Sequence, residues 1–166
     1  MDSEVAIPIK IKSSDGKVFE VNDKILSLSK FLKDMIDNNR EINQEITINQ
    51  VNAKNLEKII EYLKHHEIEK PIAIPKPLPN NDLKSFLSEW DYNFINTLSI
   101  EEAIDLINAA NFLDIGDLMS LIAAKLAAEM MTGPLEEVRE RLGVKPGMTE
   151  EELEEYDRYP LDYIFN

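Results

Sequence analysis

The stretch that decides the fold is Ile7-Pro8-Ile9-Lys10-Ile11-Lys12-Ser13-Ser14-Asp15-Gly16-Lys17-Val18-Phe19-Glu20-Val21. Isoleucine recurs at every second position of its first part, which predicts a half-buried strand. Pro8 favours an edge position or the first residues of that strand. Asp15-Gly16 supplies a tight reversal, and Phe19 and Val21 resume the alternation. The stretch therefore predicts a β-hairpin.

Short helices and one more strand follow the hairpin. Apolar residues at helical spacing predict one or two short helices over 23–37, and Ser29 is placed to cap the second. Ile46 and Ile48 indicate a third strand. Asn52 can cap the next helix, whose apolar stripe runs at i, i+3, i+4 and i+7 from Leu56.

Proline interrupts the chain over residues 68–81, at Pro71, Pro75, Pro77 and Pro79. Proline fixes φ and removes a hydrogen-bond donor, so this segment is expected to be an extended surface loop or linker.

Helical patterns dominate the second half. Ser99 and Glu102 form a capping box, and apolar stripes predict helices that end near Leu113, over 117–131 and over 135–142. A second capping box at Thr149 starts a last helix. Three short strands with early helices, followed by a helical half, predict an α+β fold in which helices stack on one small sheet.

Composition narrows the class of function. The 166 residues include 18 Lys plus Arg and 32 Asp plus Glu, giving a formal charge of −14. Such a charge opposes binding to nucleic acid or to an anionic membrane surface. Cysteine is absent, which excludes disulfides and thiol chemistry. We expect a soluble intracellular protein of the cytoplasm and nucleus.

Patterns that would carry catalysis are missing. The sequence has no glycine-rich phosphate loop and no nucleophile elbow. His65 and His66, with Glu69, could begin a metal site, but no third ligand is placed by spacing. A solvated helix end explains the two histidines more simply. We therefore expect no enzyme, no cofactor and no metal.

The last third of the chain has a surplus of apolar residues that short helices cannot easily bury. Leu135, Val138 and Leu142 share one helical pattern, and Tyr163-Ile164-Phe165 follow in the tail. They could pack back on the helix at 117–131, or they could form a groove that a partner helix completes. Both interpretations stay open.

Five blocks of residues, in order along nearly the whole chain, match one known family. The blocks are Ile9–Val21; Val51-Asn52-Ala53 with the helix ending at His65-His66; Trp90-Asp91 with Phe94; Ala109-Ala110-Asn111-Phe112-Leu113-Asp114-Ile115; and Glu136-Glu137-Val138-Arg139 followed by Thr149-Glu150-Glu151-Glu152. The set resembles the S-phase-kinase-associated protein family, the adaptor subunit of SCF ubiquitin ligases. The fourth block is close to that family's Ala-Ala-Asn-Tyr-Leu-Asp-Ile.

The resemblance implies a fold, two partners and a set of contact residues. It implies a BTB/POZ fold over 1–131, with the proline-rich loop at about 68–81, and an F-box-binding helical extension over 132–166. Such an adaptor joins the N-terminal domain of a cullin to an F-box protein and leaves catalysis to other subunits. The cullin-binding positions would be Asn111 and Phe112. The F-box-binding positions would be Ala103, Ile104, Ile107, Ala123, Leu126, Ala127, Val138, Leu142 and Val144.

Some features depart from the family or leave alternatives open. Phe112 lacks the hydroxyl of the family's tyrosine, and Leu135 stands at the family's proline position, next to Pro134. The tail lacks the family's tryptophan. An elongin C-like adaptor of another cullin ligase is the alternative, and it would end near residue 131. Weak homodimerisation of the free protein also stays open.

Overall fold

The hairpin and a third strand form one sheet. The structure, a computed structural model, describes residues 8–38 and 45–144. Strand β1 (Pro8–Lys12) pairs antiparallel with β2 (Val18–Asn22) and parallel with β3 (Ile46–Thr47), in the order β2-β1-β3. The three predicted strands are confirmed. Pro8 is the first residue of the central strand, where its missing donor costs little.

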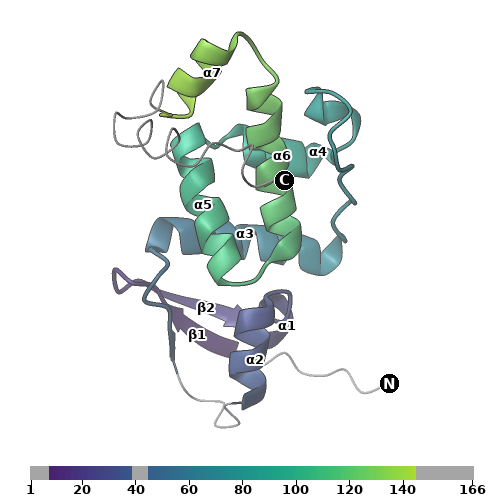
Figure 1. Ribbon diagram of the computed structural model, residues 1–166. Coiled ribbons are helices and arrows are strands. Elements are labelled where there is room, and N and C mark those ends of the chain that lie inside the picture. The colour runs from purple at the N-terminus through teal and green to yellow at the C-terminus, as the bar shows by residue number, and fades with distance from the viewer. Residues whose placement is uncertain (1–7, 39–44, 145–166) are drawn as a thin grey trace, which may run out of the picture. The chain divides into compact units, whose positions relative to one another are not determined.

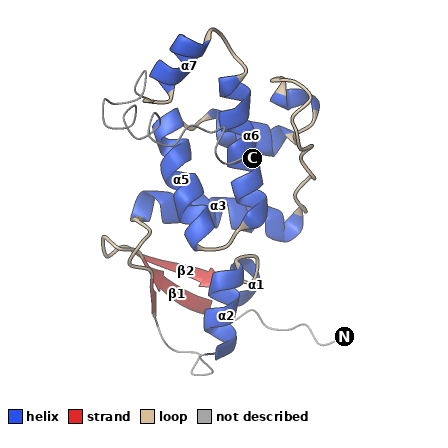
Figure 2. Cartoon of the chain, in the orientation of Figure 1, coloured by secondary structure: helices blue, strands red, loops and turns tan. Residues whose placement is uncertain are grey.

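One face of this sheet is buried. Ile9, Ile11 and Val21 lie in the core, whereas Lys10 and Glu20 between them are exposed. This alternation is what a two-residue period produces when helices cover a single face. The sheet lies at one end of the first unit, and helices stack on it (Figures 1 and 2).

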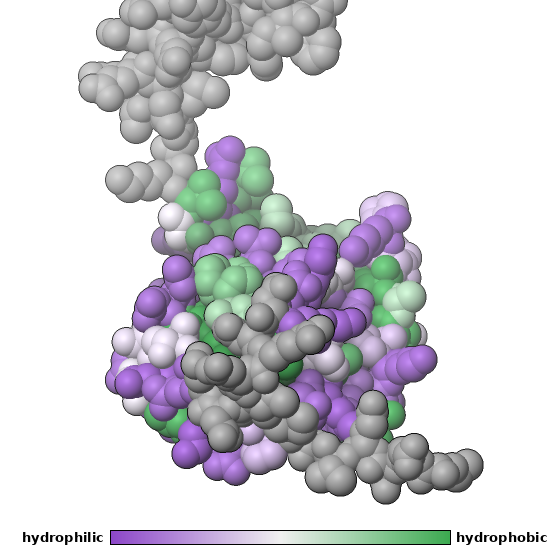
Figure 3. Space-filling view, turned by 90° about the horizontal axis from the view of Figure 1, so that it is seen from below, coloured by the Kyte–Doolittle hydropathy of each residue, from purple (hydrophilic) through white to green (hydrophobic). Residues whose placement is uncertain are grey.

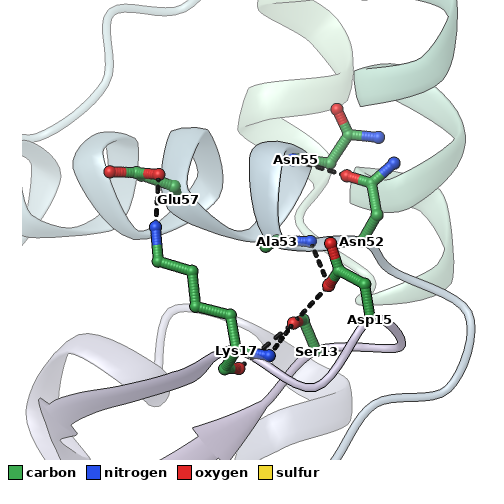
Figure 4. A network of polar contacts seen from close by, with 7 residues as sticks. All are labelled: Ser13, Asp15, Lys17, Asn52, Ala53, Asn55 and Glu57. Carbon is green, nitrogen blue, oxygen red and sulfur yellow. Dashed lines mark hydrogen bonds and ion pairs between the residues drawn. The ribbon is translucent and has the colours of Figure 1, made fainter.

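The hairpin turn is tied to the start of the longest helix, α3 (Ala53–Ile68). Asp15 Oδ1 accepts hydrogen bonds from Ser13 Oγ at 2.6 Å and from the N–H of Ala53 at 2.8 Å (Figure 4). The hydrogen bond from Ser13 and that from the Ala53 backbone hold the pKa of Asp15 below its ordinary value, against the opposing effect of burial. Asn52 caps the helix in turn, by accepting from Asn55 N. The turn thereby fixes where α3 begins.

Helices make up most of the remaining described residues. The bounds of the other helices are α1 (Asp23–Leu26), α2 (Lys30–Asn38), the short 3-10 helix η1 (Leu83–Ser85), α4 (Glu89–Asn96), α5 (Ile100–Phe112), α6 (Gly116–Met130) and α7 (Leu135–Arg141). α3 packs against α5 and α1, and α5 packs against α6.

Local signals located the helix starts well. Ser29 accepts from Leu32 N and caps α2, and Ser99 and Glu102 form the predicted capping box of α5. The sequence patterns predicted neither η1 nor α4 as a separate helix, and Ser88 caps α4. Such short helices are stabilised mainly by packing against neighbouring elements. They have no long apolar stripe from which periodicity could predict them.

The proline-rich segment is a loop, as predicted, but part of it belongs to the core. Ile74 and Leu78 pack against the buried cluster. The ammonium of Lys76 donates to Ser120 Oγ of α6 at 3.0 Å. The segment therefore lies along the folded unit instead of acting as a free linker.

The chain divides into two compact units at Met131/Thr132. The core described above belongs to the first unit, and α7 belongs to the second. The second capping box at Thr149, the helix expected after it and the aromatic tail lie outside the described residues.

Candidate protein-binding surfaces

The turn from α5 to α6 presents the two predicted cullin-binding positions. Asn111 is exposed, and Phe112, the last residue of α5, is half-buried. The N–H of Ile115 bonds to the carbonyl of Ala110 at 3.0 Å. Asp114 adopts φ 51°, a left-handed conformation that Asp tolerates better than most residues. The backbone of this turn is therefore well defined.

Except for Ala103, the predicted F-box positions of the first unit lie on the outer sides of α5 and α6. Ile104 is exposed and Ile107 is half-buried, and their spacing places them on the same face of α5 as Asn111. On α6, Ala123 is exposed, and Leu126 and Ala127 are half-buried. All three lie away from the buried stripe of that helix. All five side chains are apolar, and Ile107 and Leu126 also pack against the buried core.

Ala103 is different from the other predicted F-box positions. Its side chain is fully buried in the core of the first unit. A partner cannot reach it in this fold, so Ala103 can support the outer face of α5 only from beneath.

The remaining predicted F-box positions belong to the second unit. Val138 on α7 is buried, Leu142 is half-buried and Val144 is exposed, as is Leu135. Gly133 has φ 92°, and the carbonyl of Thr132 accepts a hydrogen bond from the Arg141 guanidinium. The exposed apolar side chains fit the expected surplus, whereas Val138 is already covered.

The two histidines are not a solvated helix end, and here the sequence interpretation is corrected. His66 is buried, and its ring lies 4.2 Å from that of Tyr62. The ring of His65 stacks on Trp90 at 3.9 Å, and its Nε2 lies 3.3 Å from a Glu69 carboxylate oxygen without hydrogen-bonding geometry. A signal was present, because His66 continues the apolar stripe three residues after Leu63.

The hydrogen-bond partners of His66 favour its protonated form. Nδ1 lies 2.7 Å from the carbonyl oxygen of Glu69, and Nε2 lies 3.0 Å from Asp91 Oδ1. A carbonyl and a carboxylate can only accept, so both ring nitrogens donate and the ring is a cation.

The pKa values of the pair agree with that assignment. Burial alone would lower the pKa of His66, but the hydrogen bonds to Asp91 and to the Glu69 carbonyl outweigh it and raise the pKa. Burial alone would raise the pKa of Asp91, but hydrogen bonds from His66 and Ser88 lower it. The pair is therefore a structural link between α3 and α4.

The described residues offer no centre for metal chemistry. Over 8–38 and 45–144, no three His, Asp or Glu side chains are grouped so as to hold a metal ion. In the same residues no helix is both long and apolar enough to cross a membrane. Seen from the end that carries the sheet and α2, the surface is mostly hydrophilic, with separate hydrophobic areas (Figure 3).

Comparisons with known proteins lead to the same family that the sequence resembles. Residues 8–68 match the model of the "Skp1 family, tetramerisation domain". The chain is 31% identical to the S-phase kinase-associated protein 1 homolog of Tetrahymena thermophila, over 87% of this chain and 86% of that protein. It is 32% identical to the SCF ubiquitin ligase complex protein SKP1a of Dictyostelium discoideum, over 89% and 90%. It is 29% identical to the E3 ubiquitin ligase complex SCF subunit sconC of Arthroderma otae, over 90% of each chain.

Proposed function

The chain belongs to the Skp1 family, and from this membership we propose that it is the adaptor subunit of an SCF-type ubiquitin ligase. It would join a cullin scaffold to F-box proteins that carry substrates, and leave catalysis to other subunits. The observation that carries the proposal is that relatives named for SKP1 or the SCF complex match over 86% to 90% of their own length.

The adaptor role requires one contact with a cullin and one with an F-box protein. The end of α5, which bears Asn111 and Phe112, is the proposed cullin surface. The outer sides of α5 and α6 are one proposed F-box contact, and the apolar residues of the second unit are a further proposed F-box contact. Burial of apolar area at about 25 cal/mol per Å² would drive the second contact, before the costs of association are subtracted. An adaptor needs both contacts at once, because its role is to hold two proteins together.

The elongin C-like alternative is not favoured. The full-length relatives bear SKP1 or SCF names, and their matches extend over about nine-tenths of the chain, well beyond residue 131. A test of box-peptide specificity would separate the two adaptor classes, because an elongin C-like protein would prefer a different box helix to the F-box.

The decisive experiment is reconstitution. The full chain is mixed with a cullin N-terminal domain and an F-box protein, and size-exclusion chromatography is used to detect a complex of all three. We expect all three to elute together. If neither partner binds at about micromolar concentration, which corresponds to roughly −8 kcal/mol, the proposal fails.

Two variants separate the contacts. Asn111→Lys with Phe112→Lys should abolish cullin binding and spare F-box binding. The matched control is Ile68→Lys with Ile72→Lys, which adds the same charge at two exposed apolar side chains of the proline-rich region. Leu142→Asp should weaken F-box binding and leave cullin binding intact. It is a cleaner test than Val138→Asp, because Val138 is buried. Equal loss of both partners in either variant would contradict the assignment of surfaces.

A further inference from the structure

The α5–α6 turn is attached to a segment that lies far from it in sequence. Ser29, which caps α2, is fully buried, and its hydroxyl donates to the carbonyl oxygen of Leu113. The next residue, Lys30, donates its backbone N–H to the carbonyl of Asp114 at 3.4 Å. These bonds satisfy two carbonyls that the end of α5 would otherwise leave without partners. The start of α2 thereby holds the turn in place.

An aromatic pair lies beside these bonds. The rings of Phe31, on the first turn of α2, and Phe112 have their centroids 5.0 Å apart and are tilted by 50°. That geometry is typical of a favourable aromatic contact. Both side chains are half-buried, so the pair is neither wholly core nor wholly surface. The ring of Phe31 supports the ring of Phe112 from the side of α2.

Phe112 needs such support because it lacks the hydroxyl of the tyrosine that the family has at this position. A tyrosine could orient itself by a hydrogen bond, but a phenylalanine ring is oriented by packing alone. Exposed Asn111 is its direct neighbour. Any disorder in the ring of Phe112 would therefore be felt at the proposed cullin surface.

We propose that Phe31 is a positioning residue for cullin binding, which acts by holding Phe112 in its binding orientation. The proposal rests on the proposed adaptor function and adds to it that α2 is part of the recognition unit. Lys30 strengthens the same junction weakly, because its ammonium lies 4.0 Å from the Asp114 carboxylate and both groups are exposed.

The first test compares affinities for a cullin N-terminal domain and for an F-box protein. Phe31→Ala should weaken cullin binding about three- to tenfold, the range of one aromatic contact. F-box affinity should not change, and Phe31→Tyr should restore cullin binding. The matched control is Phe86→Ala, which removes an equally half-buried ring from the segment before α4 and should leave cullin binding unchanged.

A double-mutant cycle separates positioning from direct contact. If Phe31 acts through Phe112, then Phe31→Ala should change cullin affinity by less than about twofold in a Phe112→Ala background. If the two substitutions weaken binding independently, Phe31 contributes on its own and the positioning role is overturned.

The outcomes also separate this inference from the function on which it rests. Failure of the wild-type chain to bind a cullin counts against the adaptor. Normal binding by Phe31→Ala, with loss of binding by Phe112→Lys, counts against the role of Phe31 alone. If Phe31→Ala does not fold, then Phe31→Leu, which keeps most of the buried volume, decides: weakened cullin binding supports the proposal and wild-type binding overturns it.

Discussion

The two ends of α3 are held by contacts of the same chemical kind in opposite surroundings. Near its start, Lys54 Nζ lies 2.6 Å from Glu102 Oε1 of α5, and the two side chains are 69% and 35% exposed. At its end, His66 Nε2 lies 3.0 Å from Asp91 Oδ1 of α4, and the side chains are 3% and 5% exposed. The shorter contact is the weaker one, because water and salt compete with it.

At the exposed end of α3, hydrogen bonds alone shift the pKa of Glu102 strongly. The hydrogen bond from Lys54, and then that from the Ser99 backbone, lower the pKa of Glu102 to about 2. In water-accessible groups such a shift says little about stability, because the partners are solvated when the contact breaks.

The buried pair of His66 and Asp91 differs in its contribution to stability, because water cannot solvate either group when the contact breaks. Asp91 also accepts from Ser88 Oγ at 2.8 Å, so each of its oxygens has a partner. Tyr62 and Trp90 pack around the imidazole ring of His66. Removing one partner would leave a polar group buried and unsatisfied.

The largest expected effect follows from breaking the buried pair. Asp91→Ala should lower the free energy of unfolding by about 3–5 kcal/mol, the usual result of leaving one partner of a buried ion pair alone. Urea denaturation measures it. The control is Glu102→Gln, which removes the charge of the exposed pair and keeps an oxygen for the capping box. Equal losses in the two variants would mean that burial does not distinguish the two ends.

Varying pH sharpens the same comparison. The raised pKa of His66 means that its stabilisation is complete below the ordinary histidine value near 6.5. It is lost as pH rises through the higher folded value. The lowered pKa of Asp91 means that its stabilisation is complete above about 3.9 and is lost as pH falls below that. The pair should therefore stabilise most between these limits.

The measurement is the difference in unfolding free energy between the wild type and Asp91→Asn, from pH 5 to pH 9. The wild type has a formal charge of −14, and the variant differs from it by one charge. Taking the difference therefore cancels most of the effect of overall charge on the pH dependence of stability. The difference should shrink on the alkaline side. A difference that stays constant up to pH 9 would show that His66 is neutral in the native protein.

The same contrast explains what the sequence could predict. Ser99 and Glu102 are three residues apart, so their capping box is visible in the sequence and is present in the structure. His66 and Asp91 are 25 residues apart, and no local pattern pairs them. The burial of His66 was therefore missed, although its place on the stripe of α3 was visible.

The candidate binding surfaces were also predictable only in part. The family resemblance proposed Asn111 and Phe112 as cullin-binding positions, but it did not predict the packing of Phe31 against Phe112, because that contact joins distant segments. α5 also carries two apolar stripes, one through Ile104 and Ile107 and one through Ala103 and Leu106. Periodicity alone cannot tell which stripe faces the core, and the family resemblance, which supplied Ala103 as an F-box position, does not tell this either.

The smallest expected effect lies at the exposed end of α3. Lys54→Met removes the ion pair with Glu102 but keeps the aliphatic stem and the capping box, so the melting temperature should fall only slightly. Screening weakens such exposed contacts, since the Debye length is about 10 Å at 0.1 M salt and about 3 Å at 1 M. The difference from the wild type should therefore vanish as salt is added, whereas the loss in Asp91→Ala should persist. Thermal melts of both variants at low and high salt check this. If the melting temperature of Lys54→Met stays below that of the wild type at high salt, the exposed contact is no more sensitive to screening than the buried one.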